Sequence, residues 1–159
     1  MNAKNLFRLI SSLFICHMAG VIGSIFVVPN IPWLDSLRRP GFAPPNWVIT
    51  PVWLMLFTLM GFSLYLILNK RSEDKGTRVA LGIFGVQLVI NTSWNYFFFG
   101  LRSLLSGLIV IIVMWVTIAI TIAAFFRVSK KAGALLLPYL LWVSVAALIN
   151  YYLWILNPA

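Results

Sequence analysis

The sequence predicts an all-α membrane protein, a five-transmembrane-helix bundle whose Pro/Trp-rich first loop caps an internal pocket. Of the 159 residues, 62% are hydrophobic and 9% are charged, whereas about a quarter of an ordinary soluble domain is charged. Five uncharged stretches follow one another, and each is long enough to cross a hydrocarbon core of about 30 Å. These stretches are continuously apolar rather than alternating, which disfavours a β-barrel.

The predicted spans form one domain over residues 1–159 and cover residues 9–28, 47–69, 79–99, 104–126 and 133–156. The first span follows Lys4 and Arg8 and therefore imitates a signal peptide. Its apolar stretch lacks a small-residue cleavage site, so we interpret it as a retained helix. It contains the single cysteine, Cys16, which excludes an intramolecular disulfide. It also contains His17, interpreted as a hydrogen-bonded neutral imidazole, and no metal site is predicted because no second ligand accompanies it.

The polar segment 33–53, between the first two spans, reads WLDSLRRPGFAPPNWVITPVW. Apolar runs flank it on both sides, so it is expected at a membrane surface. The pair Pro44-Pro45 fixes φ twice and removes two backbone donors, which makes the loop stiff and unable to pair as a strand. A stiff segment of this kind is suited to capping a cavity between helices.

The third span carries polar residues on one face. Gln87, Asn91, Trp94 and Asn95 lie at i, i+4, i+7 and i+8, so they share one side of a helix. Amides inside a bilayer need partners, and this face is therefore expected to point inward. The amides either tie helices together or orient a ligand, and the sequence leaves both interpretations open.

The last span carries a second inward stripe, in which Trp142, Ala146 and Asn150 step by four. The small Ala146 leaves room beside Trp142 for a flat molecule. Together with Trp53 and Trp94, Trp142 forms a candidate aromatic box for a planar ligand. The alternative is that these rings only pack the core.

The charges predict an orientation and exclude several functions. The net charge of +9 does not indicate nucleic-acid binding, because the basic residues cluster at helix ends, as expected near anionic membrane lipid. The acidic residues all lie in loops, which argues against an ion pump. No catalytic carboxylate pair, nucleophile set or phosphate loop is present, so enzyme is the weaker class. Nine Lys and Arg residues fall at one predicted end (Lys4, Arg8, Lys70, Arg71, Lys75, Arg78, Arg127, Lys130, Lys131) and three at the other (Arg38, Arg39, Arg102).

This bias places the N-terminus in the cytoplasm and the C-terminus outside. The cationic cytoplasmic side and the absence of a transit peptide favour a bacterial plasma membrane. The expectation is therefore a multi-pass integral membrane protein.

Four motifs carry a family resemblance: RPGFAPPNWVITPVW (39–53), MGFSLYLI (60–67), QLVINTSWNYFFFGLR (87–102) and VSKKAGALLLPYLLWVSVAALINYYLW (128–154). In their order and their proline–tryptophan spacing, the chain resembles the translocator protein family, also called tryptophan-rich sensory proteins or peripheral-type benzodiazepine receptors. The resemblance extends from Trp33 to Asn157.

The resemblance implies a five-helix homodimer with a pocket beneath the first loop, binding a porphyrin or haem and requiring no cofactor. It implies porphyrin transport or efflux, or stress sensing. The first alternative is light-dependent porphyrin degradation, in which Trp53 and Trp142 match the implicated tryptophans. A second alternative is a membrane assembly subunit without a ligand. The ligand-binding positions that the family resemblance implies are Trp33, Pro44, Trp53, Phe57, Asn91, Trp94, Asn95, Trp142 and Ala146.

The chain departs from the family pattern at several points. Gly41-Phe42 replaces the usual Ser-Trp, which makes one aromatic wall smaller. The cholesterol-recognition pattern needs a basic residue after its tyrosine, but LWILNPA follows Tyr152, so sterol binding is not predicted. Gly82 and Gly85 are candidates for a dimer contact, although their spacing differs from GxxxG.

Overall fold

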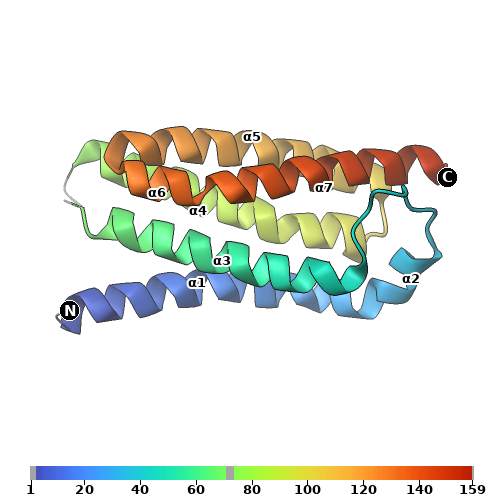
Figure 1. Cartoon of the computed structure of the whole chain (residues 1–159), viewed down its shortest axis with the longest axis horizontal. Coiled ribbons are helices and arrows are strands. Elements are labelled where there is room, and N and C mark those ends of the chain that lie inside the picture. The colour runs from blue at the N-terminus through green and yellow to red at the C-terminus, as the bar shows by residue number, and fades with distance from the viewer. Residues whose placement is uncertain (1–2, 71–73, 159) are drawn as a thin grey trace.

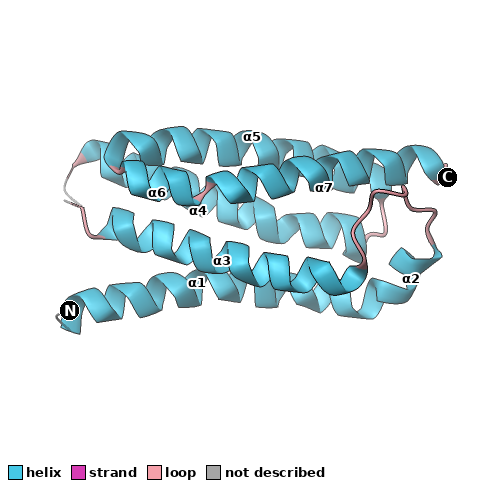
Figure 2. Cartoon of the chain, viewed as in Figure 1, coloured by secondary structure: helices cyan, strands magenta, loops and turns pink. Residues whose placement is uncertain are grey.

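The chain is helical throughout the part that the structure describes. A computed structural model describes residues 3–70 and 74–158, and every regular element within them is a helix, as Figure 2 shows. The long helices are α1 (Ala3–Val27), α3 (Asn46–Leu68), α4 (Lys75–Asn95), α5 (Leu104–Val128) and α7 (Leu137–Leu156). The short elements are the 3₁₀ turn η1 (Val28–Asn30), α2 (Ile31–Ser36), the π-helical turn η2 (Tyr96–Gly100) and α6 (Lys130–Leu135). The predicted all-α class is confirmed.

The long helices lie along one axis, and consecutive ones run in opposite directions (Figure 1). The two termini therefore lie at opposite ends of the bundle. At the N-terminal end, Arg8 Nη1 donates to Asn69 Oδ1 at 3.1 Å, which joins the start of α1 to the end of α3. At the other end, Arg102 Nε donates to Asn30 Oδ1 at 2.8 Å, which joins the segment after α4 to η1.

The outer surface of the bundle is apolar, as a lipid environment requires. Four helical stretches in the described residues are long and apolar enough to cross a membrane: Ala3–Ser36, Asn46–Leu68, Leu104–Val128 and Lys130–Leu156. Large side chains such as Phe7 and Leu141 are 72% and 70% exposed on them, which would be costly in water. The protein is a multi-pass membrane protein.

Helix α4, the predicted third span, is not among these four stretches. The amides of Gln87, Asn91 and Asn95 lower its mean hydropathy. Gln87 and Asn91 are buried inside the bundle, so the face that reduces the hydropathy of α4 does not meet lipid.

Prolines make the predicted boundaries differ from the observed ones. The first predicted span ends at residue 28, but helical structure continues to Ser36, because Pro29 and Pro32 lie in the first turns of η1 and α2, where a backbone donor is not needed. Trp33, predicted in the loop, is therefore helical. The last predicted span is divided at Leu136, with Pro138 in the first turn of α7. Of the predicted loop charges, Arg71 and Glu73 lie outside the described residues.

Candidate ligand-binding site

A cavity of about 420 Å³ lies among the helices near the segment that joins α2 to α3. Its volume is within the range of about 300–1,000 Å³ that is typical of small-molecule sites. The wall is largely apolar and aromatic and includes a few polar groups from α1, α4 and α7. The lining residues are His17, Gly20, Val21, Ser24, Val27, Leu34, Arg39, Pro44, Ile49, Thr50, Trp53, Leu54, Phe57, Asn91, Trp94, Asn95, Phe98, Phe99, Ile111, Trp142, Ala146, Ile149, Asn150 and Leu153.

Most of the residues selected from the sequence meet at this cavity. Pro44, Trp53, Phe57, Asn91, Trp94, Asn95, Trp142 and Ala146 all line it. Trp33 does not belong to its lining. The ring of Trp33 instead packs edge-on against Phe98 and Phe99, with centroid separations of 5.5 and 6.4 Å, and thus supports two residues of the wall from behind.

The amides of α4 hold the bundle together behind the cavity. Gln87 Nε2 and Asn91 Nδ2 both donate to the hydroxyl oxygen of Tyr139 on α7, each at 2.6 Å. All three side chains are buried. The sequence left open whether these amides join helices or orient a ligand, and the bond of Gln87 joins α4 to α7. Asn91 serves the same link and also lines the cavity.

The tryptophan of α4 contributes a ring face rather than a hydrogen bond donor. Trp94 Nε1 donates to the carbonyl oxygen of Gly107 on α5 at 3.1 Å. Its ring stacks on Phe98 at a centroid distance of 5.0 Å. The indole is thereby fixed by its polar edge, and its surface is available to an apolar ligand.

Two buried polar atoms on α7 have no protein partner. Trp142 Nε1 and Asn150 Oδ1 are both inaccessible and unbonded within the described part of the chain. The amide nitrogen of Asn150 is satisfied, since it donates to the Ala146 carbonyl at 2.9 Å. A buried donor or acceptor without a partner costs about 1–3 kcal/mol. Trp142 and Asn150 both line the cavity, but these two atoms have no accessible surface, so a bound molecule pairs with them only after the side chains turn toward it.

His17 is hydrogen-bonded through its ring nitrogen Nδ1. Nδ1 lies 3.0 Å from the Leu13 carbonyl oxygen, and because a carbonyl can only accept, this nitrogen carries the proton. Nε2 lies 3.3 Å from Thr58 Oγ1, but the one hydroxyl proton of Thr58 also points to the Leu54 carbonyl oxygen at 2.8 Å and can serve only one of these acceptors. The bond to Leu13 orients the imidazole, and His17 lines the cavity.

The segment between α2 and α3 brings a cation to the cavity. Arg39 lines the cavity, and its Nη2 donates to Asn46 Oδ1 at 2.7 Å. Asn46 Nδ2 in turn donates to Asp35 Oδ1 at 2.8 Å. The segment is also bonded to the end of α7, because the Arg38 amide donates to Asn157 Oδ1 at 2.9 Å.

Comparison with known proteins identifies the scaffold around this cavity. Residues 12–155 match the TspO/MBR family. The chain belongs to the TspO/MBR family. It is 38% identical to the tryptophan-rich protein TspO of Chlorobaculum tepidum over 98% of this chain and 99% of that protein. It is 36% identical to the protein CrtK of Rhodobacter capsulatus, over 90% and 88% of the two chains. It is also 36% identical to the translocator protein of Ovis aries, over 85% and 81%.

Membership in the TspO/MBR family confirms the resemblance seen in the sequence. The names of these relatives describe translocator or tryptophan-rich proteins rather than enzymes. The polar lining residues that were not selected from the sequence as ligand-binding are His17, Ser24, Arg39, Thr50 and Asn150. Arg39 lies in an irregular segment, where no helical period indicates which side chains point inward.

Proposed function

We propose that this protein binds a tetrapyrrole, a porphyrin or haem, in the 420 Å³ cavity and acts in porphyrin transport or efflux or in stress sensing. The lining of the cavity carries the proposal, because the rings of Trp53, Phe57, Trp94 and Trp142 and the guanidinium of Arg39 all belong to it. An apolar, aromatic cavity with a few polar groups is the usual form of a small-molecule site.

The chemistry of a tetrapyrrole is complementary to this wall. Its planar ring matches the flat aromatic surfaces of Trp53, Trp94 and Phe57, which favour stacking and area burial. Its carboxylates are acceptors suited to the guanidinium of Arg39, which lines the cavity.

The proposed arrangement in the membrane has five spans, with α4 crossing beside the other four. The segment with Arg39 and Pro44 then caps the cavity from the side opposite the N-terminus. The N-terminus faces the cytoplasm of a bacterium, the C-terminus lies outside the plasma membrane, and two copies form a homodimer. Gly82 and Gly85 support a dimer contact on α4, because an added Cβ at either one meets nothing within 4 Å.

Binding is tested by titrating purified protein with protoporphyrin IX and following fluorescence quenching. We expect saturation at low micromolar concentration. The double variant Trp53→Phe plus Trp142→Phe should bind much more weakly. The matched control, Trp115→Phe plus Trp154→Phe, removes two indoles that do not line the cavity. Equal affinity in the two double variants would refute the proposed site.

The second candidate function is light-dependent porphyrin degradation, which is favoured by the presence of Trp53 and Trp142 in one cavity. Illumination of the purified protein with protoporphyrin IX tests it. A new product relative to a detergent blank, lost in the same double variant, would support this function, and its absence would exclude it. A subunit without any ligand requires side chains to fill the space between these indoles, and the cavity counts against it.

A further inference from the structure

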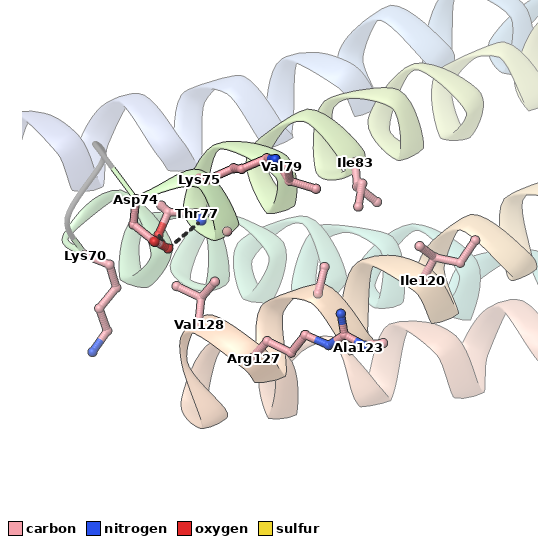
Figure 3. Close-up of a pocket in the computed structure, with 12 residues that line it drawn as sticks. Lys70, Asp74, Lys75, Thr77, Val79, Ile83, Ile120, Ala123, Arg127 and Val128 are labelled. Atoms are coloured by element: carbon pink, nitrogen blue, oxygen red, sulfur yellow. Dashed lines mark hydrogen bonds between the residues drawn. The ribbon is translucent and has the colours of Figure 1, made fainter.

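A second hollow lies at the opposite end of the bundle, between the start of α4 and the end of α5 (Figure 3). Its volume is about 650 Å³. It shares no residue with the tetrapyrrole cavity, so whatever it holds is independent of the function proposed above. Its lining residues, called the basic groove here, are Lys70, Asp74, Lys75, Gly76, Thr77, Val79, Ile83, Ile120, Ala123, Ala124, Arg127 and Val128.

Three cations from three helix ends surround the mouth of the basic groove. Lys70 follows α3, Lys75 begins α4 and Arg127 lies in the last turn of α5. All three are exposed, and within the described residues their side chains make neither an ion pair nor a hydrogen bond. Three cationic residues without a side-chain partner among the described residues therefore line one hollow.

The one carboxylate of the basic groove is already engaged. Asp74 is the N-cap of α4, and its Oδ2 accepts from the Thr77 amide at 3.1 Å and lies 3.5 Å from Thr77 Oγ1. Figure 3 shows this bond beside the groove. Asp74 stabilises the helix start in this way and reduces the positive charge of the mouth without cancelling it.

Below the cations the groove becomes apolar. Val79 and Ile83 form one wall on α4, and Ile120 and Ala123 form the other on α5. Val79 is 52% and Ile120 48% exposed, so these walls open toward lipid. Ile120 lies seven residues before Arg127 on α5, which corresponds to about 10 Å along the helix axis. The groove is thus cationic at the membrane surface and apolar within the span.

We propose that the basic groove binds one anionic phospholipid. Its phosphate lies among Lys70, Lys75 and Arg127, and one acyl chain follows the apolar walls beneath them. Basic pockets between membrane helices recognise acidic head groups in this way, and guanidinium pairs well with phosphate. A zwitterionic lipid is disfavoured because its own cation would meet the same three charges. A soluble phosphate would leave the apolar walls unused.

Native mass spectrometry of the full-length protein in detergent tests the proposal, with phosphatidylglycerol and phosphatidylcholine of identical acyl chains supplied at equal concentration. We expect phosphatidylglycerol adducts to dominate. Each of Lys70→Gln, Lys75→Gln and Arg127→Gln should reduce them about fivefold. Ala123→Trp places a large side chain between the apolar walls without changing the charge, and it should reduce the phosphatidylglycerol adducts as well.

Two controls remove the same charge elsewhere. Lys4→Gln lies at the same end outside the groove, and Arg38→Gln lies at the opposite end; both should leave the adducts unchanged. Thermal unfolding of every variant confirms that it is folded. The proposal would be overturned if the two lipids gave equal adducts, or if the control variants lost as much phosphatidylglycerol as the groove variants. It would also be overturned if inorganic phosphate displaced the lipid completely and Ala123→Trp had no effect on the adducts. If Ala123→Trp abolished a dimer but left the lipid adducts unchanged, a second copy of the chain would cover the groove, and the proposal would be wrong.

Discussion

The tryptophans of the aromatic cavity differ in how their polar atoms are engaged. Trp53, Trp94 and Trp142 all line it, but their indole nitrogens differ in environment. Trp94 Nε1 is bonded to Gly107, whereas Trp142 Nε1 is buried without a partner. Trp94 therefore provides surface alone, whereas Trp142 also keeps a free donor, which pairs with a ligand once the indole turns toward the cavity.

Replacing Trp142 by phenylalanine should separate binding from stability. The substitution removes the unpartnered donor, so the ligand-free protein should lose little stability beyond the smaller ring. Protoporphyrin IX affinity should fall about fivefold, because a hydrogen bond contributes about 1 kcal/mol net. Fluorescence titration and thermal unfolding measure the two effects. Trp154→Phe, outside the cavity, is the control and should alter neither; a fully retained affinity in Trp142→Phe would contradict the role of the indole N–H.

Tyr139, in contrast to Trp142, is expected to affect stability, because its hydroxyl links α7 to α4. Tyr139→Phe leaves the buried amides of Gln87 and Asn91 without their shared acceptor, at a cost of about 1–3 kcal/mol for each unpaired group. We expect a clear decrease in the unfolding temperature in detergent. Tyr151→Phe removes a hydroxyl from an exposed residue and should have almost no effect. Similar decreases in both variants would show that the amides find other partners.

At the scale of the helices, close packing of α1 on α3 depends on a small residue. A Cβ added at Gly61 of α3 would lie 2.9 Å from the Leu13 Cα of α1 and 3.3 Å from its backbone nitrogen. Backbone atoms cannot move aside as a flexible side chain can, so the two helices would have to separate. Small residues at helix contacts are the usual means of close approach in membranes.

Gly61→Ala should therefore destabilise the protein by about 1–3 kcal/mol, the usual cost of overpacking. Gly41→Ala is the matched control, since its added Cβ meets nothing within 4 Å and its φ is not positive; it should be neutral or stabilising by about 0.4–1 kcal/mol. Thermal unfolding in the same detergent compares them. A Gly41→Ala variant less stable than Gly61→Ala would contradict this packing.

Helical faces could be predicted from the sequence, whereas the breaks between helices could not. The spacing of Gln87, Asn91 and Trp94 fixes one face of α4, since the helical period determines which residues point together. No such period governs the segment after residue 30, so the helical state of Trp33 and the inward position of Arg39 were missed. The break before α7 has a visible cause in Pro138, but a proline in an apolar run is compatible with either a kink or a new helix.

At the scale of the whole molecule, the two ends of the bundle differ in chemistry. The end with the N-terminus carries the basic groove and most of the described Lys and Arg residues. The other end holds the aromatic cavity and the proline-rich segment with Arg38 and Arg39. A membrane in which these ends face different compartments explains the asymmetry, because basic residues are retained on the cytoplasmic side.

The path of α4 decides whether that asymmetry corresponds to five crossings. Its first residue follows shortly after Asn69, which is bonded to Arg8 at the N-terminal end. The segment after it is bonded to Asn30 at the opposite end through Arg102. The 21 residues of α4 span about 30 Å at 1.5 Å per residue, which matches a hydrocarbon core.

Cysteine accessibility in intact bacteria tests this topology, in a Cys16→Ala background that removes the buried native thiol. Single cysteines replace Arg38 and Leu101 at one end and Lys75 and Lys130 at the other. A membrane-impermeant maleimide should label the first pair in intact cells and the second pair only after permeabilisation. If α4 does not cross, position 101 shares its side with position 75, so identical labelling of these two cysteines would refute the fifth span. Labelling of position 130 in intact cells would refute the cytoplasmic location of the basic end.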